Sequence, residues 1–150
     1  MRLYLDSAYI AKCYLRERGT DAVLDLVESS SSRGSSELAM LEVVAVFHRH
    51  LREGKLSRAA FEETFERFKS EDADGVWQWI PVDSTLLGEA ALSYRKLSSS
   101  LFLRSADCLH LVSARRAGFR QVHSNDKRLL EACPHFDMEG IDVIDSFKFE

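Results

Sequence analysis

Hydrophobic and polar positions follow two different periods along this chain. Short apolar segments of strand length occupy residues 2–6, 76–82, 121–124 and 141–144. Helical periodicity fills the chain between them, at residues 8–17, 20–28, 36–51, around Phe61, Phe65 and Phe68, and at 85–97, 104–117 and 126–133. The Ser-rich stretch at residues 29–34 predicts a loop. Strands that alternate with helices favour parallel pairing, so we expect a three-layer α/β/α fold with a central, mainly parallel sheet of four or five strands.

Length and composition favour a single soluble domain. The chain has 150 residues, which we expect to form one domain over residues 1–150. Apolar residues make up 45% of the chain and charged residues 29%, as in ordinary globular proteins. The longest uncharged apolar run, residues 43–47, falls far short of the roughly 18 residues that a membrane span needs. We therefore expect a cytoplasmic protein that makes no contact with a membrane.

The three cysteines, Cys13, Cys108 and Cys133, predict neither a zinc site nor redox chemistry. Their number is odd, and no two of them have the CxxC spacing of a metal or redox motif. We expect them to be small buried hydrophobic residues.

Charge is distributed unevenly along the chain. The net charge is −4, which argues against coating nucleic acid by bulk electrostatics. Residues 61–94 carry eight acids and two bases, whereas residues 95–128 carry eight bases and two acids. Those two acids, Asp107 and Asp126, stand isolated in the most basic third of the chain.

Two acids follow predicted strands. Asp6 closes the first apolar segment, and Asp126 comes just after the segment at 121–124. In open parallel sheets ligands bind beyond the carboxyl ends of the strands, so both side chains should lie on the same rim. Each could also simply cap the helix that follows it.

Two further acids, Glu42 and Asp107, lie on apolar helix faces. Glu42 has Leu38, Ala39, Ala45 and Val46 at helical spacing, and an ionised carboxylate in such a place needs a base, a proton or a cation. Asp107 could be neutralised by Arg104 three residues before it, or hydrogen-bonded by His110 three residues after it.

Four carboxylates without a His or Cys shell would make a hard-oxygen site. Such a site suits Mg²⁺ or Mn²⁺, which keep waters and phosphate oxygens as further ligands. A metal of this kind assists in-line displacement at a phosphodiester, so phosphodiester hydrolysis is the reaction we infer.

Four segments together resemble a known family. LYLDSAYIAKCYL, SSELAMLEV, RSADCLHLVSA and HSNDKRLLEA, in this order and spacing, are similar to the PIN-domain ribonucleases, and most of all to the VapC toxins of toxin–antitoxin pairs. The resemblance implies that Asp6, Glu42, Asp107 and Asp126 form the catalytic metal site. Ser7 and Ser124 match hydroxyl residues of the family pattern, and Asn125 stands beside the last acid. Ala8 departs from the pattern, where a small polar residue is frequent.

The resemblance also implies a biological role. It predicts a metal-dependent endoribonuclease that cuts tRNA or another structured RNA, forms a homodimer and is inhibited by a cognate VapB-like antitoxin. Arg104, Lys127 and Lys12 are the candidates for contacts with RNA phosphates. The rival hypothesis is a catalytically inactive PIN-like module that binds protein or RNA. Nucleotide-binding enzymes are disfavoured, because no GxGxxG or Walker glycine pattern follows the first strand.

Overall fold

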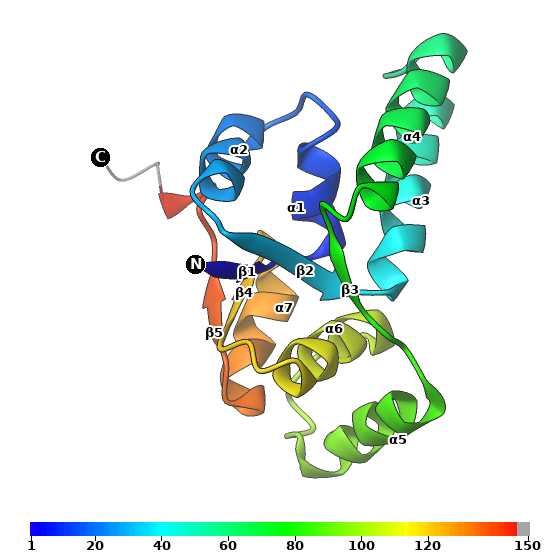
Figure 1. Cartoon of the computed structure of the whole chain (residues 1–150). Helices are drawn as coiled ribbons and strands as arrows, with labels where there is room; N and C mark the ends of the chain where they lie inside the picture. The colour runs from blue at the N-terminus through cyan, green and yellow to red at the C-terminus, as the bar shows by residue number, and fades with distance from the viewer. Residues whose placement is uncertain (147–150) are drawn as a thin grey trace.

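Short parallel strands form the centre of the molecule, which the computed structural model describes over residues 1–146. In these residues β1 (Arg2–Tyr4), β2 (Ser32–Ser36) and β3 (Gln78–Ile80) pair in that order, and β4 (Gln121–His123) pairs with β5 (Glu139–Ile141). A parallel bridge between Leu5 and His123 joins the two groups. The described strands therefore run in the order β5-β4-β1-β2-β3, all in one direction (Figure 1).

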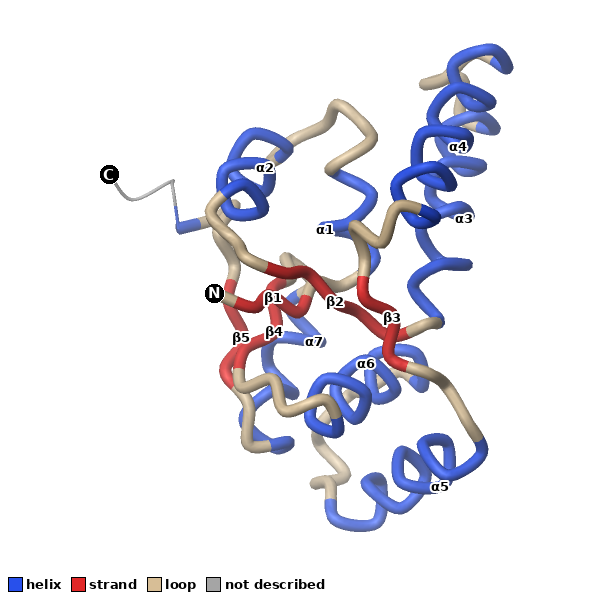
Figure 2. The backbone as a smooth tube through the Cα atoms, viewed as in Figure 1, coloured by secondary structure: helices blue, strands red, loops and turns tan. Residues whose placement is uncertain are grey.

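Helices cover both faces of the sheet, as Figure 2 shows. On one side lie the first four helices, α1 (Ser7–Lys12), α2 (Thr20–Glu28), α3 (Leu38–Arg52) and α4 (Arg58–Ala73). On the other side lie α5 (Ser84–Ser93), α6 (Ser105–Arg116) and α7 (Lys127–Ala132), with the 3₁₀ turns η1 (Tyr94–Lys96) and η2 (Cys133–Phe136). The predicted three-layer α/β/α fold with a parallel sheet is confirmed.

The alternation of side chains along β1 places its residues in two separate parts of the hydrophobic core. Leu3 and Leu5 pack into a cluster with α1 to α4, whereas Tyr4, between them in sequence, packs with α5, α6 and α7. All three side chains are fully buried. Alternate residues of a strand point to opposite faces, so β1 anchors both layers and carries the chain directly to Asp6.

The interior strand β2 was predicted as a loop, and that prediction is wrong. Its residues are Ser, Arg and Gly, which have low strand propensity, but β2 is paired on both edges. Small side chains are required there: a Cβ on Gly34 would lie 3.1 Å from the Gln78 carbonyl oxygen and 3.3 Å from the Phe119 ring. Close packing against β3 and the Phe119 ring therefore favours a residue without a Cβ at position 34.

Several predicted boundaries also move. The helix expected at residues 8–17 ends at Lys12, because the chain then turns and buries Tyr14 and Leu15 in the core. The strand expected at 141–144 is β5, which ends at Ile141. The helix expected at 85–97 divides into α5 and η1.

Two expectations about composition can be compared with the structure. Cys108 and Cys133 are buried, Cys13 is partly buried, and all three are free thiols, as predicted. No helix within residues 1–146 is long and apolar enough to cross a membrane.

Candidate active site

The carboxyl ends of β1 and β4 bring Asp6 and Asp126 to the same rim of the sheet. The Asp6 backbone N–H donates to the His123 carbonyl at 3.1 Å, which fixes the two strand ends side by side. The Ser124 hydroxyl contacts both acids: its Oγ donates to Asp6 Oδ2 and accepts from the Asp126 N–H at 2.9 Å. Ser124 therefore ties the two acids together.

Asp6 is the most perturbed acid of this rim. It is 5% exposed, and burial raises its pKa from 3.8 to about 6. Hydrogen bonds from Ser124 and from the Tyr9 N–H oppose that shift, and the neighbouring charge of Asp126 adds to it. Asp6 also caps α1 through the Tyr9 N–H at 2.8 Å, so the capping role considered from the sequence coexists with its place on the rim.

Arg104 joins Asp107 to Asp126. Its Nε lies 2.8 Å from Asp107 Oδ2, and its Nη2 lies 2.5 Å from Asp126 Oδ2. Asp107 stands in the first turn of α6 and is 8% exposed, while Asp126 caps α7 through the N–H groups of Arg128 and Leu129. The salt bridge between Arg104 and Asp107 weighed from the sequence is present, and the same guanidinium also holds an acid 22 residues away.

Glu42 reaches the site from α3 and meets α6. Its Oε1 lies 2.6 Å from Nε2 of His110, and the other ring nitrogen, Nδ1, lies 2.8 Å from the Tyr4 hydroxyl. His110, expected to be a packed helix residue or a partner of Asp107, is buried but bonds to Glu42 instead. The sequence analysis assigned no role to Tyr4. The one feature that could have indicated a role is its position on a buried strand, two residues before Asp6.

Contacts through Ser124 and Arg104 therefore link Asp6, Asp107 and Asp126, whereas Glu42 is joined to α6 through His110, and the four acids do not close into a complete metal cage. Within residues 1–146 no three His, Cys, Asp or Glu side chains are arranged to hold an ion. The donor set nevertheless fits a hard cation: the ligands are carboxylate oxygens, one of them is buried with a raised pKa, and a guanidinium already bridges two others.

The other predicted residues lie at varied distances from this rim. Ser7 begins α1 and Asn125 precedes the cap of α7, and both are half-buried. Lys127 is exposed at the start of α7. Lys12 does not fit a phosphate contact, because it is 7% exposed and its Nζ pairs with Glu17 at 2.6 Å.

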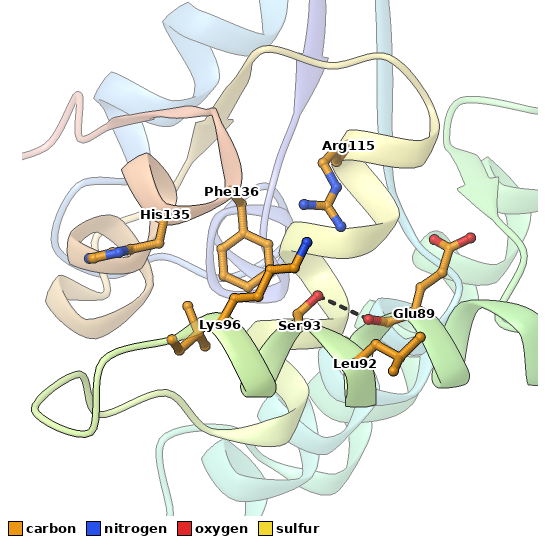
Figure 3. A pocket seen from close by; sticks show the side chains of 8 residues that line it. Glu89, Leu92, Ser93, Lys96, Arg115, His135 and Phe136 are labelled. Carbon is orange, nitrogen blue, oxygen red and sulfur yellow. Dashed lines mark hydrogen bonds between the residues drawn. The ribbon is translucent and has the colours of Figure 1, made fainter.

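A basic hollow lies on the same side of the sheet as α6, away from the acids. It holds about 270 Å³ between the ends of α5 and α6 and the turns η1 and η2. Figure 3 shows Lys96 and Arg115 directed toward one another across it, with His135 and Glu89 at its margin. Arg115 stands eight residues after Asp107 on α6, about 12 Å along the helix axis.

An apolar groove adjoins the acidic rim. It holds about 600 Å³ between the starts of α3 and α6 and the outer face of α5. Leu87 and Tyr94 on its wall are half exposed, and Ser105 and Ala106, which immediately precede Asp107, form its floor.

The chain belongs to the PIN domain family, whose model matches residues 3–133. Its fold is similar to that of VapC20 from Mycobacterium tuberculosis, a toxin that cleaves the sarcin–ricin loop, with a TM-score of 0.69, 13% identity, and coverage of 87% of this chain and 94% of that one. It is also similar to FitAB bound to a DNA fragment (TM-score 0.67, 14% identity, 95% of both chains). VapBC2 from Rickettsia felis bound to promoter DNA gives a TM-score of 0.63, 12% identity, and 95% and 98% coverage. No curated protein sequence matches this chain.

Proposed function

We propose that this protein is a VapC-like toxin, a metal-dependent endoribonuclease that hydrolyses RNA phosphodiester bonds at the rim formed by Asp6, Glu42, Asp107 and Asp126. The observation that supports the proposal is that contacts link acids from separate segments of a PIN fold: Ser124 bonds to Asp6 and to the Asp126 N–H, and Arg104 binds both Asp107 and Asp126. Separate roles as helix caps or surface residues do not explain why these acids are linked to one another.

Each acid has a separate part in the proposed chemistry. Asp6, Glu42 and Asp107 would hold Mg²⁺ or Mn²⁺, directly or through water, and Asp126 would complete the site or orient the attacking water. A bound ion would lower the pKa of a water and stabilise the charge on the phosphate. In the hydrolysis the water oxygen bonds to phosphorus, the bond to the leaving ribose oxygen breaks, and that oxygen takes up a proton. Arg104 and Lys127 flank the acids and would contact RNA phosphates.

We also propose that the apolar groove beside the acids receives a segment of a cognate antitoxin. Its half-exposed Leu87 and Tyr94 and the carboxylates next to it suit an amphipathic segment that carries positive charge. Two of the similar structures, FitAB and VapBC2, are complexes of paired proteins. The homodimer implied by the resemblance stays a prediction, which the mass in solution, measured by light scattering, would test.

Cleavage of RNA tests the function. Purified protein should cut total cellular RNA or tRNA into discrete fragments with Mg²⁺ or Mn²⁺ and not with EDTA, and Asp107→Asn should abolish cleavage. Asp83→Asn is the matched control, because Asp83 is also bound to an arginine near a helix start but lies outside the site. Equal cleavage by wild type and Asp107→Asn would refute the assignment. Tight RNA binding without cleavage would favour the inactive binding module.

A further inference from the structure

A chain of buried hydrogen bonds supports Glu42 from inside the core. Nε2 of His110 is 2.6 Å from Glu42 Oε1, Nδ1 of His110 is 2.8 Å from the Tyr4 hydroxyl, and that hydroxyl is 3.1 Å from the Ser36 N–H. Tyr4 is fully buried and His110 is 2% exposed, whereas the Glu42 side chain is 28% exposed. The chain therefore leads from the centre of the sheet to the open rim.

The donors and acceptors can be arranged in one consistent direction. An ionised carboxylate only accepts, so Nε2 of His110 must carry the hydrogen that it shares with Glu42. The Tyr4 oxygen accepts from the Ser36 N–H, and its own O–H donates to Nδ1. The ring orientation of His110 is thus fixed by contacts at both nitrogens.

We propose that His110 and Tyr4 are positioning residues that orient Glu42 as a metal ligand, an inference that rests on the proposed metal-dependent function. His110 occupies Oε1, and within residues 1–146 Oε2 accepts no hydrogen bond, so one oxygen is fixed and the other is left for a cation. A side chain on a helix surface otherwise samples several rotamers, and ordering it in advance favours metal binding.

A second buried histidine next to a carboxylate, His50, lacks this arrangement. His50, also buried and also on α3, lies 3.5 Å from Glu17, but there the carboxylate is already bonded to Lys12 at 2.6 Å. Tyr14, also a buried tyrosine, uses its hydroxyl for contacts with Glu71 and with Trp77 Nε1, in the other half of the core. His50 and Tyr14 are therefore matched controls for His110 and Tyr4.

Mn²⁺ affinity, measured by calorimetry on the whole chain, tests the proposal. His110→Gln should weaken Mn²⁺ binding about 10- to 100-fold, the usual effect of removing a group that orients a ligand. Tyr4→Phe, which removes one hydroxyl, should weaken it less but measurably. His50→Gln and Tyr14→Phe should match wild type. Because His110→Gln could misfold, the fold of each variant is checked by circular dichroism. Tyr4→Phe is a milder change in the same chain of hydrogen bonds and tests the proposal even if His110→Gln does not fold.

The imidazole provides an independent readout without metal. Long-range ¹H–¹⁵N spectra should show a hydrogen on Nε2 of His110, and Tyr4→Phe should shift the Nδ1 resonance. An Nε2 without a hydrogen, or Mn²⁺ affinity of folded His110→Gln and Tyr4→Phe within threefold of wild type, would overturn the positioning role alone. Failure of wild type to bind Mn²⁺ at all would overturn the proposed function, and the positioning role with it.

Discussion

Burial makes Asp6 costly to ionise while no cation is bound. Its pKa of about 6 lies above the ordinary 3.8, so between these values the folded state holds a proton that the unfolded state has lost. The stability that Asp6 contributes is therefore complete below about pH 4 and is lost as the pH rises through 6. Asp6 therefore lowers the stability of the metal-free fold at neutral pH, which is consistent with its proposed role as a metal ligand.

Asp6→Asn should therefore stabilise the metal-free protein at neutral pH. In EDTA at pH 7.5 we expect the free energy of unfolding to rise by about 3 kcal/mol, since the pKa of Asp6 is raised from 3.8 to about 6 and one pKa unit corresponds to about 1.4 kcal/mol, and the gain should vanish near pH 4. Urea unfolding across pH 4–8 measures this. Asp83→Asn should act oppositely, because bonds from the Leu86 N–H and from Arg116 lower the pKa of Asp83. A gain for Asp6→Asn that does not depend on pH would contradict the explanation.

Arg104 occupies two carboxylates that a cation would share. Its removal by Arg104→Gln should raise Mn²⁺ affinity about fivefold, because a half-exposed ion pair is worth about 1 kcal/mol. Calorimetry measures the change. Arg116→Gln is the control, since Arg116 also bridges two acids, Asp83 and Glu89, outside the rim. Weaker Mn²⁺ binding by Arg104→Gln would show that the guanidinium assists the metal instead of competing with it.

At the residue scale, the sequence indicates which acids are candidates, but it does not indicate the contacts that hold their side chains. Asp6 and Asp126 could be placed on one rim because strand ends and following acids are local signals. Glu42 could be singled out because its helical neighbours are apolar. Its bond to His110 spans 68 residues, and the second bond of Arg104 spans 22, so neither has a local signal. The exclusion of Lys12 from the surface depends on burial, which spacing does not reveal.

At the element scale, β2 shows how tertiary packing overrides propensity. Its Ser and Gly residues predict a loop, yet the strand is formed by pairing with β1 and β3. Apolar periodicity located most of the helices, but it could not show where packing ends them, as at Lys12 in α1.

Gly34→Ala tests this explanation of β2. The new Cβ would press against the Gln78 carbonyl and the Phe119 ring, so we expect a loss of about 1–3 kcal/mol in the free energy of unfolding. Gly88→Ala is the matched control, because Gly88 lies inside α5 with open space around it and should gain up to about 1 kcal/mol from helix propensity. Chemical denaturation compares the two. A neutral Gly34→Ala would show that β2 does not require a glycine.

At the scale of the whole molecule, acidic and basic residues are grouped in different segments of the sequence, but the basic segment reaches two parts of the fold. The basic segment 95–128 supplies Arg104 at the acidic rim and also Lys96 and Arg115 at the basic hollow. An overall charge of −4 is thus compatible with RNA binding at one part of the surface. That residues 1–150 form a single domain stays a prediction, although the family match spans most of them.

The basic hollow should contribute to RNA binding through phosphates. The double variant Lys96→Ala, Arg115→Ala should weaken RNA affinity and reduce the slope of log K against log salt by about 1.4, since each of two phosphate contacts to a single strand contributes roughly 0.7. Fluorescence anisotropy at several salt concentrations measures both. The control pair, Arg52→Ala with Lys69→Ala, removes the same charge from α3 and α4 on the opposite layer. Equal salt dependence in the two double variants would contradict a specific contact.

The central claim is that the four acids form one metal site. The most direct measurement is an anomalous difference map from crystals of the whole chain soaked in Mn²⁺. We predict a peak on the rim, within about 2.0–2.3 Å of carboxylate oxygens from at least two of Asp6, Glu42 and Asp107, with the Arg104 guanidinium moved from its place between Asp107 and Asp126. A map without a peak at saturating Mn²⁺, or with its only peak elsewhere on the molecule, would contradict the proposed metal-dependent mechanism.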